Sequence, residues 1–195
     1  VKDNIWYQAP ISPKANLEGS IRGIIQRLDY IRDLGVDIIY LTPIFYSNSS
    51  HKYDTIDYYT IDPAYGTMED FDLLLQECQS RDIHVILDLV VNHTGYAHNW
   101  FQAAADYLKK LPQGQEPDPE DCPYVDYYMF SKEQRSGMRI LNGTDWYYEA
   151  MFSHDMPDLN LGNPEVRKEI EKVMAFWMEK GVAGFRLDAA KEFYS

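Results

Sequence analysis

The chain has 195 residues, and its hydrophobic fraction of 45% and charged fraction of 25% are typical of a globular protein. Its formal net charge is −13, from 18 basic and 31 acidic residues, and Lys and Arg form no long run. This charge disfavours a nucleic-acid backbone and an anionic membrane surface, so we expect neither as a partner. No apolar run approaches the roughly 20 residues of a spanning helix, and residues 1–4 show no signal-peptide pattern. The compartment stays open between extracellular and cytoplasmic, with a slight preference for the former.

The alternation of strand-like and helix-like segments predicts an α/β fold with a parallel sheet. Apolar residues recur at helical spacing, and cap signals such as Thr67 and the Asn163-Pro164 pair mark helix starts. We expect strands at 5–9, 37–42 and 84–91, a fourth directly after Gly181, and helices at 20–34, 67–82, 100–110 and 164–180. Cys78 and Cys122 form no metal or redox motif, and we expect both to be free thiols.

The segment between His93 and Asn160 breaks this rhythm. Residues 111–123 are rich in proline and acidic side chains, and the aromatic runs 124–130 and 145–152 are candidate short strands. A connection of this length in a compact domain is usually a functional insertion rather than a bare loop. We therefore expect a small additional unit here.

Two predicted strands end in polar side chains. In residues 184–191 (GFRLDAAK), Arg186 and Asp188 are two positions apart and so share one face of a strand. A guanidinium beside a carboxylate keeps it ionised, which a nucleophilic aspartate requires at neutral pH; a structural ion pair is the alternative. The other strand end, 88–93 (DLVVNH), is apolar in its body and polar at its tip. We interpret Asp88 as a structural hydrogen-bond partner near the site.

These stretches resemble the α-amylase family of glycoside hydrolases. DLVVNH (88–93) and GFRLDAAK (184–191) match the motifs at the ends of its third and fourth barrel strands. MPDLN (156–160) matches the signature before its third barrel helix, and HKYDTIDY (51–58) the segment after its second strand. The match runs along essentially the whole chain. The HKYD form, and Glu192 where many α-amylases carry His, resemble the cyclomaltodextrinase and neopullulanase branch, whereas MPDLN resembles the oligosaccharide-active branch.

The resemblance implies the first half of a (β/α)8 TIM barrel with a small inserted domain after strand three. We expect barrel strands one to three with their helices at 1–93, the inserted domain at 94–160, and the third barrel helix with strand four at 161–195. Such barrels need about 250 residues, so the remainder of the catalytic domain is an expected partner; a self-contained doubly wound domain is the alternative. In the family, that remainder supplies the general acid, a Glu after strand five, and an Asp after strand seven.

The resemblance also implies roles for individual residues. Asp188 matches the family's catalytic nucleophile and Arg186 its partner. Tyr53 matches the aromatic platform beneath the sugar, and His93 matches the histidine that hydrogen-bonds the same sugar. For Tyr53 and His93 the alternative is ordinary packing.

Four further residues match family positions with supporting roles. Lys191 and Glu192 follow the nucleophile and would line the side that receives the leaving group; solvated charges at a helix start are the alternative. Asn92 and Asp158 match positions that bind a structural calcium where the inserted domain meets the barrel. Calcium takes six to eight oxygen ligands, and the alternative is a turn-capping amide with a hydrogen-bonding loop carboxylate.

These motifs predict a retaining glycoside hydrolase that cleaves α-1,4-glucosidic bonds of starch-derived glucans or maltooligosaccharides. Retaining hydrolysis needs two carboxyl groups about 5–5.5 Å apart, and Asp188 would supply the attacking one. One alternative is a 4-α-glucanotransferase or related transglycosylase, in which a second sugar receives the intermediate. The other is a non-catalytic glucan-binding subunit. We expect residues 1–195 alone to be inactive.

Overall fold

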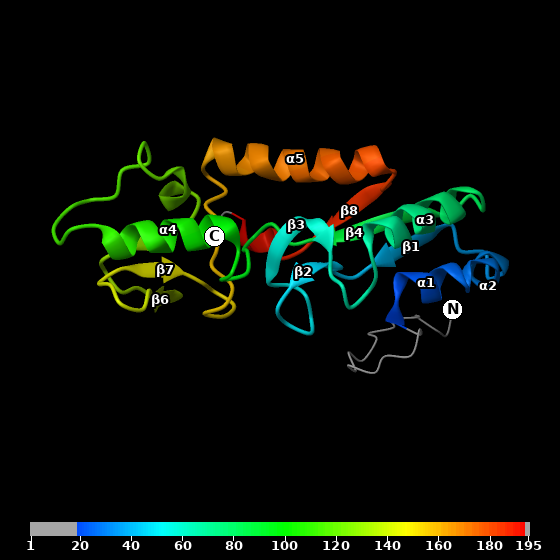
Figure 1. The fold of residues 1–195 in the computed structure, drawn as a ribbon, viewed down its shortest axis with the longest axis horizontal. Helices are drawn as coiled ribbons and strands as arrows, with labels where there is room; N and C mark the ends of the chain where they lie inside the picture. The colour runs from blue at the N-terminus through cyan, green and yellow to red at the C-terminus, as the bar shows by residue number, and fades with distance from the viewer. Residues whose placement is uncertain (1–18, 194–195) are drawn as a thin grey trace.

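The structure, a computed structural model, describes residues 19–193, so the strand expected at 5–9 lies outside the described residues. The molecule is elongated: a parallel sheet lies under helices at one end, and a small antiparallel sheet lies at the other (Figure 1). The helices are α1 (Ile21–Ile25), α2 (Leu28–Asp33), α3 (Met68–Gln79), α4 (Asn99–Lys110) and α5 (Pro164–Lys180), with short 3-10 turns η2 (Pro123–Asp126) and η3 (Ala190–Glu192). The strands are β1 (Ile38–Leu41), β2 (Phe45–Ser47), β3 (Thr55–Ile61), β4 (His84–Leu89), β5 (Phe130–Ser131), β6 (Met138–Ile140), β7 (Tyr147–Glu149) and β8 (Gly184–Leu187).

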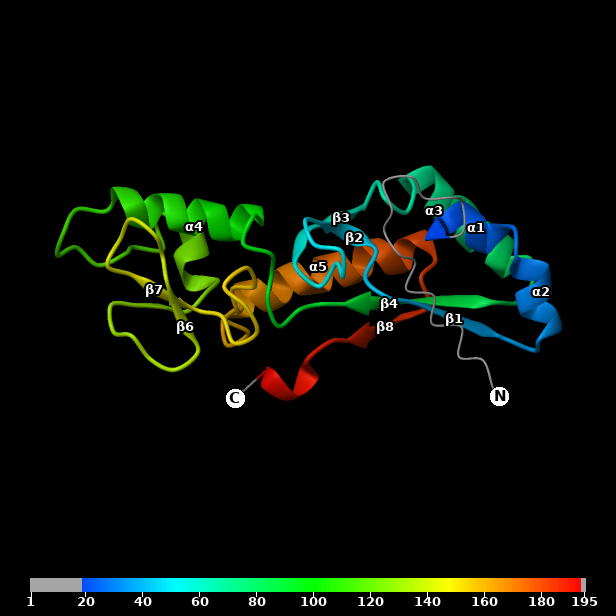
Figure 2. The ribbon, with the colours of Figure 1, turned by 90° about the horizontal axis from the view of Figure 1, so that it is seen from below.

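Strands β1, β4 and β8 form a parallel sheet in that order. They run side by side in Figure 2, with helices over one face. In register, Leu41 pairs with Leu87, and Asp88 pairs with Arg186. The predicted parallel α/β arrangement is confirmed for the part of the chain that the structure describes.

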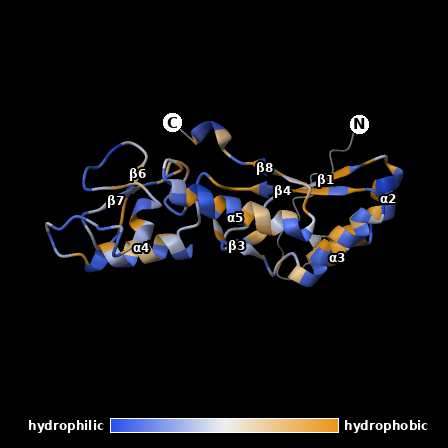
Figure 3. Cartoon of the chain, turned by 90° about the horizontal axis from the view of Figure 1, so that it is seen from above, coloured by the Kyte–Doolittle hydropathy of each residue, from blue (hydrophilic) through white to orange (hydrophobic). Residues whose placement is uncertain are grey.

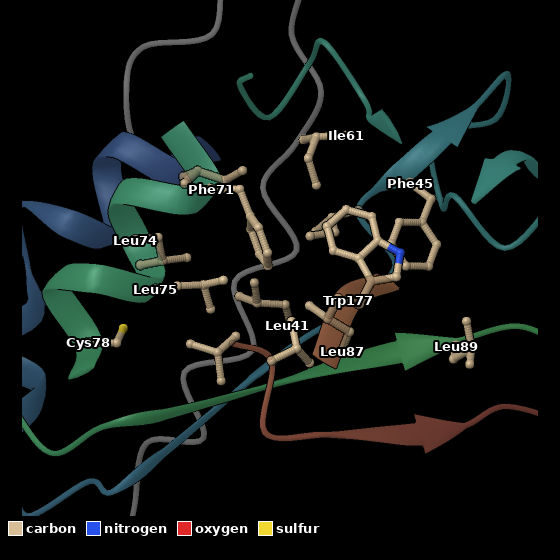
Figure 4. Packing of buried hydrophobic residues seen from close by; sticks show 14 of the residues in the cluster. Leu41, Phe45, Ile61, Phe71, Leu74, Leu75, Cys78, Leu87, Leu89 and Trp177 are labelled. Atoms are coloured by element: carbon tan, nitrogen blue, oxygen red, sulfur yellow. The ribbon is translucent and has the colours of Figure 1, made fainter. Parts of the chain in front are cut away.

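One face of this sheet is the main hydrophobic core. Leu41, Leu87 and Leu89 are buried on it, because alternate residues of a strand point to the same side. Phe71 of α3 and Trp177 of α5 pack over these leucines (Figure 4). Figure 3 shows the same pattern as apolar colour along the three strands and on α3. The opposite face carries Tyr40, Asp88 and Arg186 together with Ile38 and Ile86.

The starts of α3 and α5 and the end of α5 lie where the cap signals predict, whereas α3 ends at Gln79, before the predicted residue 82. Thr67 and Asp70 form a capping box at the start of α3, in which each side chain accepts a hydrogen bond from the other residue's N–H. Asn163 caps α5 and Pro164 is its first residue. Gly181 ends α5 with φ of 111°, a conformation that favours glycine.

Trp177 joins α5 to a hairpin, β2–β3, that is not predicted from the sequence. Its indole N–H donates to the Tyr58 carbonyl of β3 at 2.8 Å, and its ring stacks on Phe45 of β2 with centroids 5.0 Å apart. Tyr58 in turn donates its hydroxyl to the carbonyl of Val90 at 2.7 Å. The hairpin is thus held between α5 and the segment that follows β4.

The continuous helix predicted over 20–34 is wrong: the structure has two helices, α1 and α2. Arg27 lies between them with φ of −108° and ψ of 1°, outside the helical range, and its N–H donates to a carbonyl only three residues back. The bend at Arg27 accompanies burial of both Ile21 in α1 and Leu28 in α2.

Residues 94–160 contain α4, η2 and the antiparallel sheet β5–β7–β6. The predicted strand in 145–152 is present as β7. The strand predicted over 124–130 is mostly wrong, because Pro123 starts the 3-10 turn η2 and only Phe130 enters β5.

This segment has a second hydrophobic core, separate from the first. Phe101 of α4 packs edge-on against Tyr148 of β7 with ring centroids 4.9 Å apart. Val166 in the first turn of α5 is a fully buried member of the same core. The second core therefore extends past residue 160 into the helix that also covers the main sheet.

Both cysteines are free and buried, as predicted. Burial raises the pKa of the Cys78 thiol to about 11. Within residues 19–193, none of the helices has the length and apolarity to cross a bilayer.

Candidate active site

Asp88 and Arg186 lie side by side on the face of the parallel sheet that points away from the helices. They are register partners on β4 and β8, and both point away from the helices. Asp188 follows the last residue of β8, and its N–H donates to the Leu89 carbonyl at 3.1 Å, which extends the strand pairing by one residue. The sheet thus fixes the backbone of the predicted nucleophile against its neighbouring strand.

One guanidinium nitrogen, Nη1 of Arg186, donates hydrogen bonds to two carboxylates. Nη1 of Arg186 lies 2.5 Å from Oδ1 of Asp188 and 3.1 Å from each carboxylate oxygen of Asp88. Although burial lowers it, these contacts hold the pKa of Arg186 above its usual value. The expected pairing of Arg186 with Asp188 is therefore present, and Asp88 shares it.

Asp88 is the buried centre of this network. Its side chain is inaccessible to solvent, and it accepts hydrogen bonds from the hydroxyls of Tyr40 and, at 3.3 Å, Tyr53. Burial raises the pKa of Asp88, while the Tyr40 hydroxyl and the Arg186 guanidinium oppose the rise. Asp88 thus has the structural hydrogen-bonding role predicted for it.

A cleft of about 350 Å³ opens beside Asp188. Three residues predicted for the site line it together: Tyr53, His93 and Asp188. The Asp188 side chain is 19% exposed, enough to be reached from the cleft, whereas Asp88 is sealed beneath it. A carboxylate, a phenol and an imidazole therefore line the same cleft.

His93 is buried and held by the loop that carries Tyr53. Its Nε2 lies 3.2 Å from the Tyr53 carbonyl oxygen. Burial lowers the pKa of His93, although the Asp188 charge opposes this, so the imidazole is neutral at pH 7. A neutral imidazole can donate or accept a hydrogen bond without adding a charge beside Asp188.

Phe152 is a cleft residue that is not predicted from the sequence. It lies in the segment after β7, is 52% exposed, and its ring centroid is 5.2 Å from that of His93. Ser153 and Met156 line the same wall. The signal that could have identified Phe152 is its position four residues before the MPDLN motif (156–160).

The structure does not bring Lys191 and Glu192 to the cleft. They pair with each other on η3, with Nζ and Oε1 3.2 Å apart, and the Lys191 side chain is 87% exposed. This geometry agrees with the alternative of charges at a helix start. Contact of either residue with a leaving group stays a prediction.

Asn92 and Asp158 are adjacent and buried, but their arrangement does not fit a cation as it stands. The Asn92 amide donates to Oδ1 of Asp158 at 3.2 Å, and the Met151 N–H donates to Oδ2 at 2.9 Å. Within residues 19–193, no group of three or more His, Cys, Asp or Glu side chains could hold a metal. Since calcium takes six to eight oxygens, the geometry favours the hydrogen-bonded alternative, and calcium stays a prediction.

Comparison with known proteins agrees with this fold. The family model for the α-amylase catalytic domain matches residues 3–195, and the chain belongs to this family. The predicted family and fold class are therefore confirmed: the sheet β1–β4–β8 and its helices are part of a (β/α)8 barrel.

Several relatives are similar along nearly the whole chain. Alpha-amylase 3 of Dictyoglomus thermophilum is 43% identical, and the match covers 99% of this chain and 38% of that protein. Trehalose-6-phosphate hydrolase of Bacillus subtilis is 42% identical over 96% of this chain and 35% of its own length. Oligo-1,6-glucosidase of Parageobacillus thermoglucosidasius is 40% identical, and the match covers 87% of this chain and 31% of that protein. The chain thus spans about a third of the length of the relatives it matches.

Solved structures give the same result. Eubacterium rectale Amy13B shares 53% identity and a TM-score of 0.88, covering 90% of this chain and 34% of that one. The isomaltulose synthase SmuA of Protaminobacter rubrum shares 34% identity and a TM-score of 0.78, covering 89% and 32%.

Proposed function

We propose that this chain is part of a retaining glycoside hydrolase that acts on α-glucans, with Asp188 as the nucleophile. The observation that supports this most directly is the cleft in which Asp188, held by Arg186, faces Tyr53 and His93. Family membership supports the reaction class, and relatives named as an α-amylase and an oligo-1,6-glucosidase support a glucan substrate.

In the proposed reaction, an Asp188 carboxylate oxygen attacks the anomeric carbon and forms a covalent glycosyl-enzyme. Arg186 holds Oδ1 of Asp188, which keeps the carboxylate ionised and limits its rotation. Tyr53 lies beneath the sugar ring, and the neutral imidazole of His93 hydrogen-bonds a sugar hydroxyl. Phe152 covers the sugar from the opposite wall of the cleft.

The general acid and the third carboxylate of the family would come from the remainder of the catalytic domain, which we propose as the partner of this chain. Activity is therefore tested in the full-length protein. Asp188→Asn should reduce kcat by about 10⁴-fold or more with little change in stability. Asp121→Asn, which alters an exposed carboxylate in the 111–123 segment, is the matched control. An Asp188→Asn variant with parental turnover would refute the assignment, and a parental protein that binds glucan without cleaving it would favour the non-catalytic subunit.

The finer proposal is cleavage of α-1,4 bonds. A relative named as an α-amylase supports it, while relatives named as oligo-1,6-glucosidase and trehalose-6-phosphate hydrolase make other linkages the competing result. Hydrolysis rates on maltotriose, isomaltotriose and trehalose 6-phosphate distinguish these three specificities. We expect the highest rate on maltotriose.

A transglycosylase is the second candidate, favoured by the similarity to an isomaltulose synthase. In that reaction a second sugar attacks the glycosyl-enzyme in place of water. Incubation with maltotriose distinguishes the two: hydrolysis yields shorter sugars alone, whereas transfer yields maltotetraose and longer products.

A further inference from the structure

Lys52 and Asp62 form a buried ion pair that the proposed chemistry does not use. Lys52 is 5% exposed and Asp62 is 4% exposed, and Nζ lies 2.6 Å from Oδ2 of Asp62. The same Nζ donates to the Ser47 carbonyl at 3.0 Å. Burying both charges carries a desolvation cost that a neutral, well-packed pair avoids, so the position of this pair calls for an explanation.

The pair closes the segment that connects β2 to β3. Asp62 directly follows β3, and it also accepts the N–H of Ser47 at 3.2 Å and of Ala64 at 2.9 Å. Ser47 is the last residue of β2. Lys52 reaches both from a left-handed backbone with φ of 66°, which a lysine adopts only when its surroundings hold it there. The ammonium therefore fixes the returning chain against the ends of both strands.

A second buried anchor lies two residues further on. Asp54 is 7% exposed and accepts hydrogen bonds from the hydroxyls of Ser47, at 2.5 Å, and of Ser49. Tyr53 stands between these anchors: Lys52 precedes it and Asp54 follows it, and both side chains are turned into the protein. Tyr53 itself lines the cleft beside Asp188.

We propose that the Lys52–Asp62 pair positions Tyr53, and that it thereby sets the affinity of the cleft for the sugar that Asp188 attacks. This inference rests on the proposed function in taking a sugar as the ligand of the cleft. Both charges lie outside the cleft, so the pair acts through the backbone of the segment and not by contact with substrate. It is a positioning pair, and its loss should change binding more than chemistry.

The test uses the full-length protein carrying Lys52→Met with Asp62→Asn. The double variant removes both charges together and keeps one oxygen for the N–H of Ser47 or Ala64, so no buried charge is left unpaired. We expect KM for maltotriose to rise about tenfold, which corresponds to a loss of about 1.4 kcal/mol of contact between Tyr53 and the sugar. kcat should change by less than about twofold, the pattern of lost uniform binding.

The matched control is Lys168→Met with Glu165→Gln, which removes an exposed pair of the same type on α5, with Nζ and Oε1 2.7 Å apart. It should leave KM unchanged. Asp62→Glu is a second variant that keeps the charge but lengthens the side chain by one methylene, and it should also raise KM. It provides the test if the double variant does not fold.

Binding separates this inference from the proposed function. The Kd of maltotriose for Asp188→Asn protein, with and without the double substitution, is measured by titration calorimetry and needs no turnover. A tenfold weaker Kd supports the positioning role even if the parental protein proves not to be a hydrolase. Parental KM and Kd in the double variant and in Asp62→Glu would overturn the inference, as would a parental protein that binds no sugar.

Discussion

Asp158 is the residue whose ionisation distinguishes a hydrogen-bonded junction from a calcium site. It is 5% exposed, and burial raises its pKa from 3.8 to about 6 against the opposing hydrogen bond from the Met151 N–H. The folded protein therefore holds the Asp158 proton more tightly than the unfolded chain does. Replacing it with asparagine removes the titration but leaves only one oxygen for the two N–H donors, of Asn92 and Met151, that Asp158 accepts.

The sign and size of the effect follow from the shift. Below about pH 4 the carboxyl is neutral in both states. Between about pH 4 and 6 it ionises first in the unfolded chain, so the free energy of unfolding falls as pH rises. A shift of about two units corresponds to a loss of up to about 3 kcal/mol by pH 7. Asp158→Asn should lack this fall with pH, apart from a pH-independent cost for the one N–H donor that its amide leaves unpaired.

The assay is urea unfolding of parent and Asp158→Asn at pH 5 and pH 7.5 in the presence of a chelator, with Asp121→Asn as an exposed-carboxylate control. The parent should lose more stability than the variant between the two pH values. Adding calcium should then change neither protein. If calcium instead stabilises the parent at pH 7.5 and not Asp158→Asn, the carboxylate is an ionised metal ligand and the reasoning above is refuted.

Two further predictions concern residues around the cleft. Tyr40→Phe removes one hydrogen bond to the buried Asp88 carboxylate and should lower the free energy of unfolding by about 1.5–3 kcal/mol in urea titrations. An unchanged free energy of unfolding would mean that Arg186 and Tyr53 alone satisfy the hydrogen-bonding capacity of the Asp88 carboxylate. Phe152→Ala should leave stability unchanged, because the ring is half exposed, and weaken maltotriose binding roughly fivefold, as expected for about 1 kcal/mol of ring contact. Phe152→Tyr keeps the ring and should bind maltotriose as the parent does. Equal Kd values for the parent and both variants would show that Phe152 does not contact the sugar.

The sequence predicts those parts of the fold whose structure is determined by interactions within one short stretch of residues. Thr67, Asn163 and Gly181 mark helix ends through local hydrogen bonds and backbone conformation, so their positions can be read without tertiary information. The alternation in 184–191 places Arg186 and Asp188 on one side for the same reason. The register that joins Arg186 to Asp88 depends on pairing between distant strands, and the shared guanidinium could not be predicted from either stretch alone.

The features missed from the sequence depend on tertiary contacts. The β2–β3 hairpin is fixed by Trp177, which lies 119 residues after Tyr58 in the chain. Lys52 resembles a solvated loop charge until its left-handed backbone and its contact with Asp62 are known. Phe152 belongs to an aromatic run that resembles strand packing, and only the fold shows that its ring faces His93.

The cleft is lined by residues from both halves of the molecule, and Trp100 and Ile170 pack against both hydrophobic cores. Its floor, Asp188 and His93, follows strands of the first core, and its wall, Phe152 and Met156, follows a strand of the second. The oligosaccharide that we propose as ligand would contact both halves at once and link them non-covalently. Occupancy should therefore make the two cores melt as one unit and protect the segment between them from proteolysis.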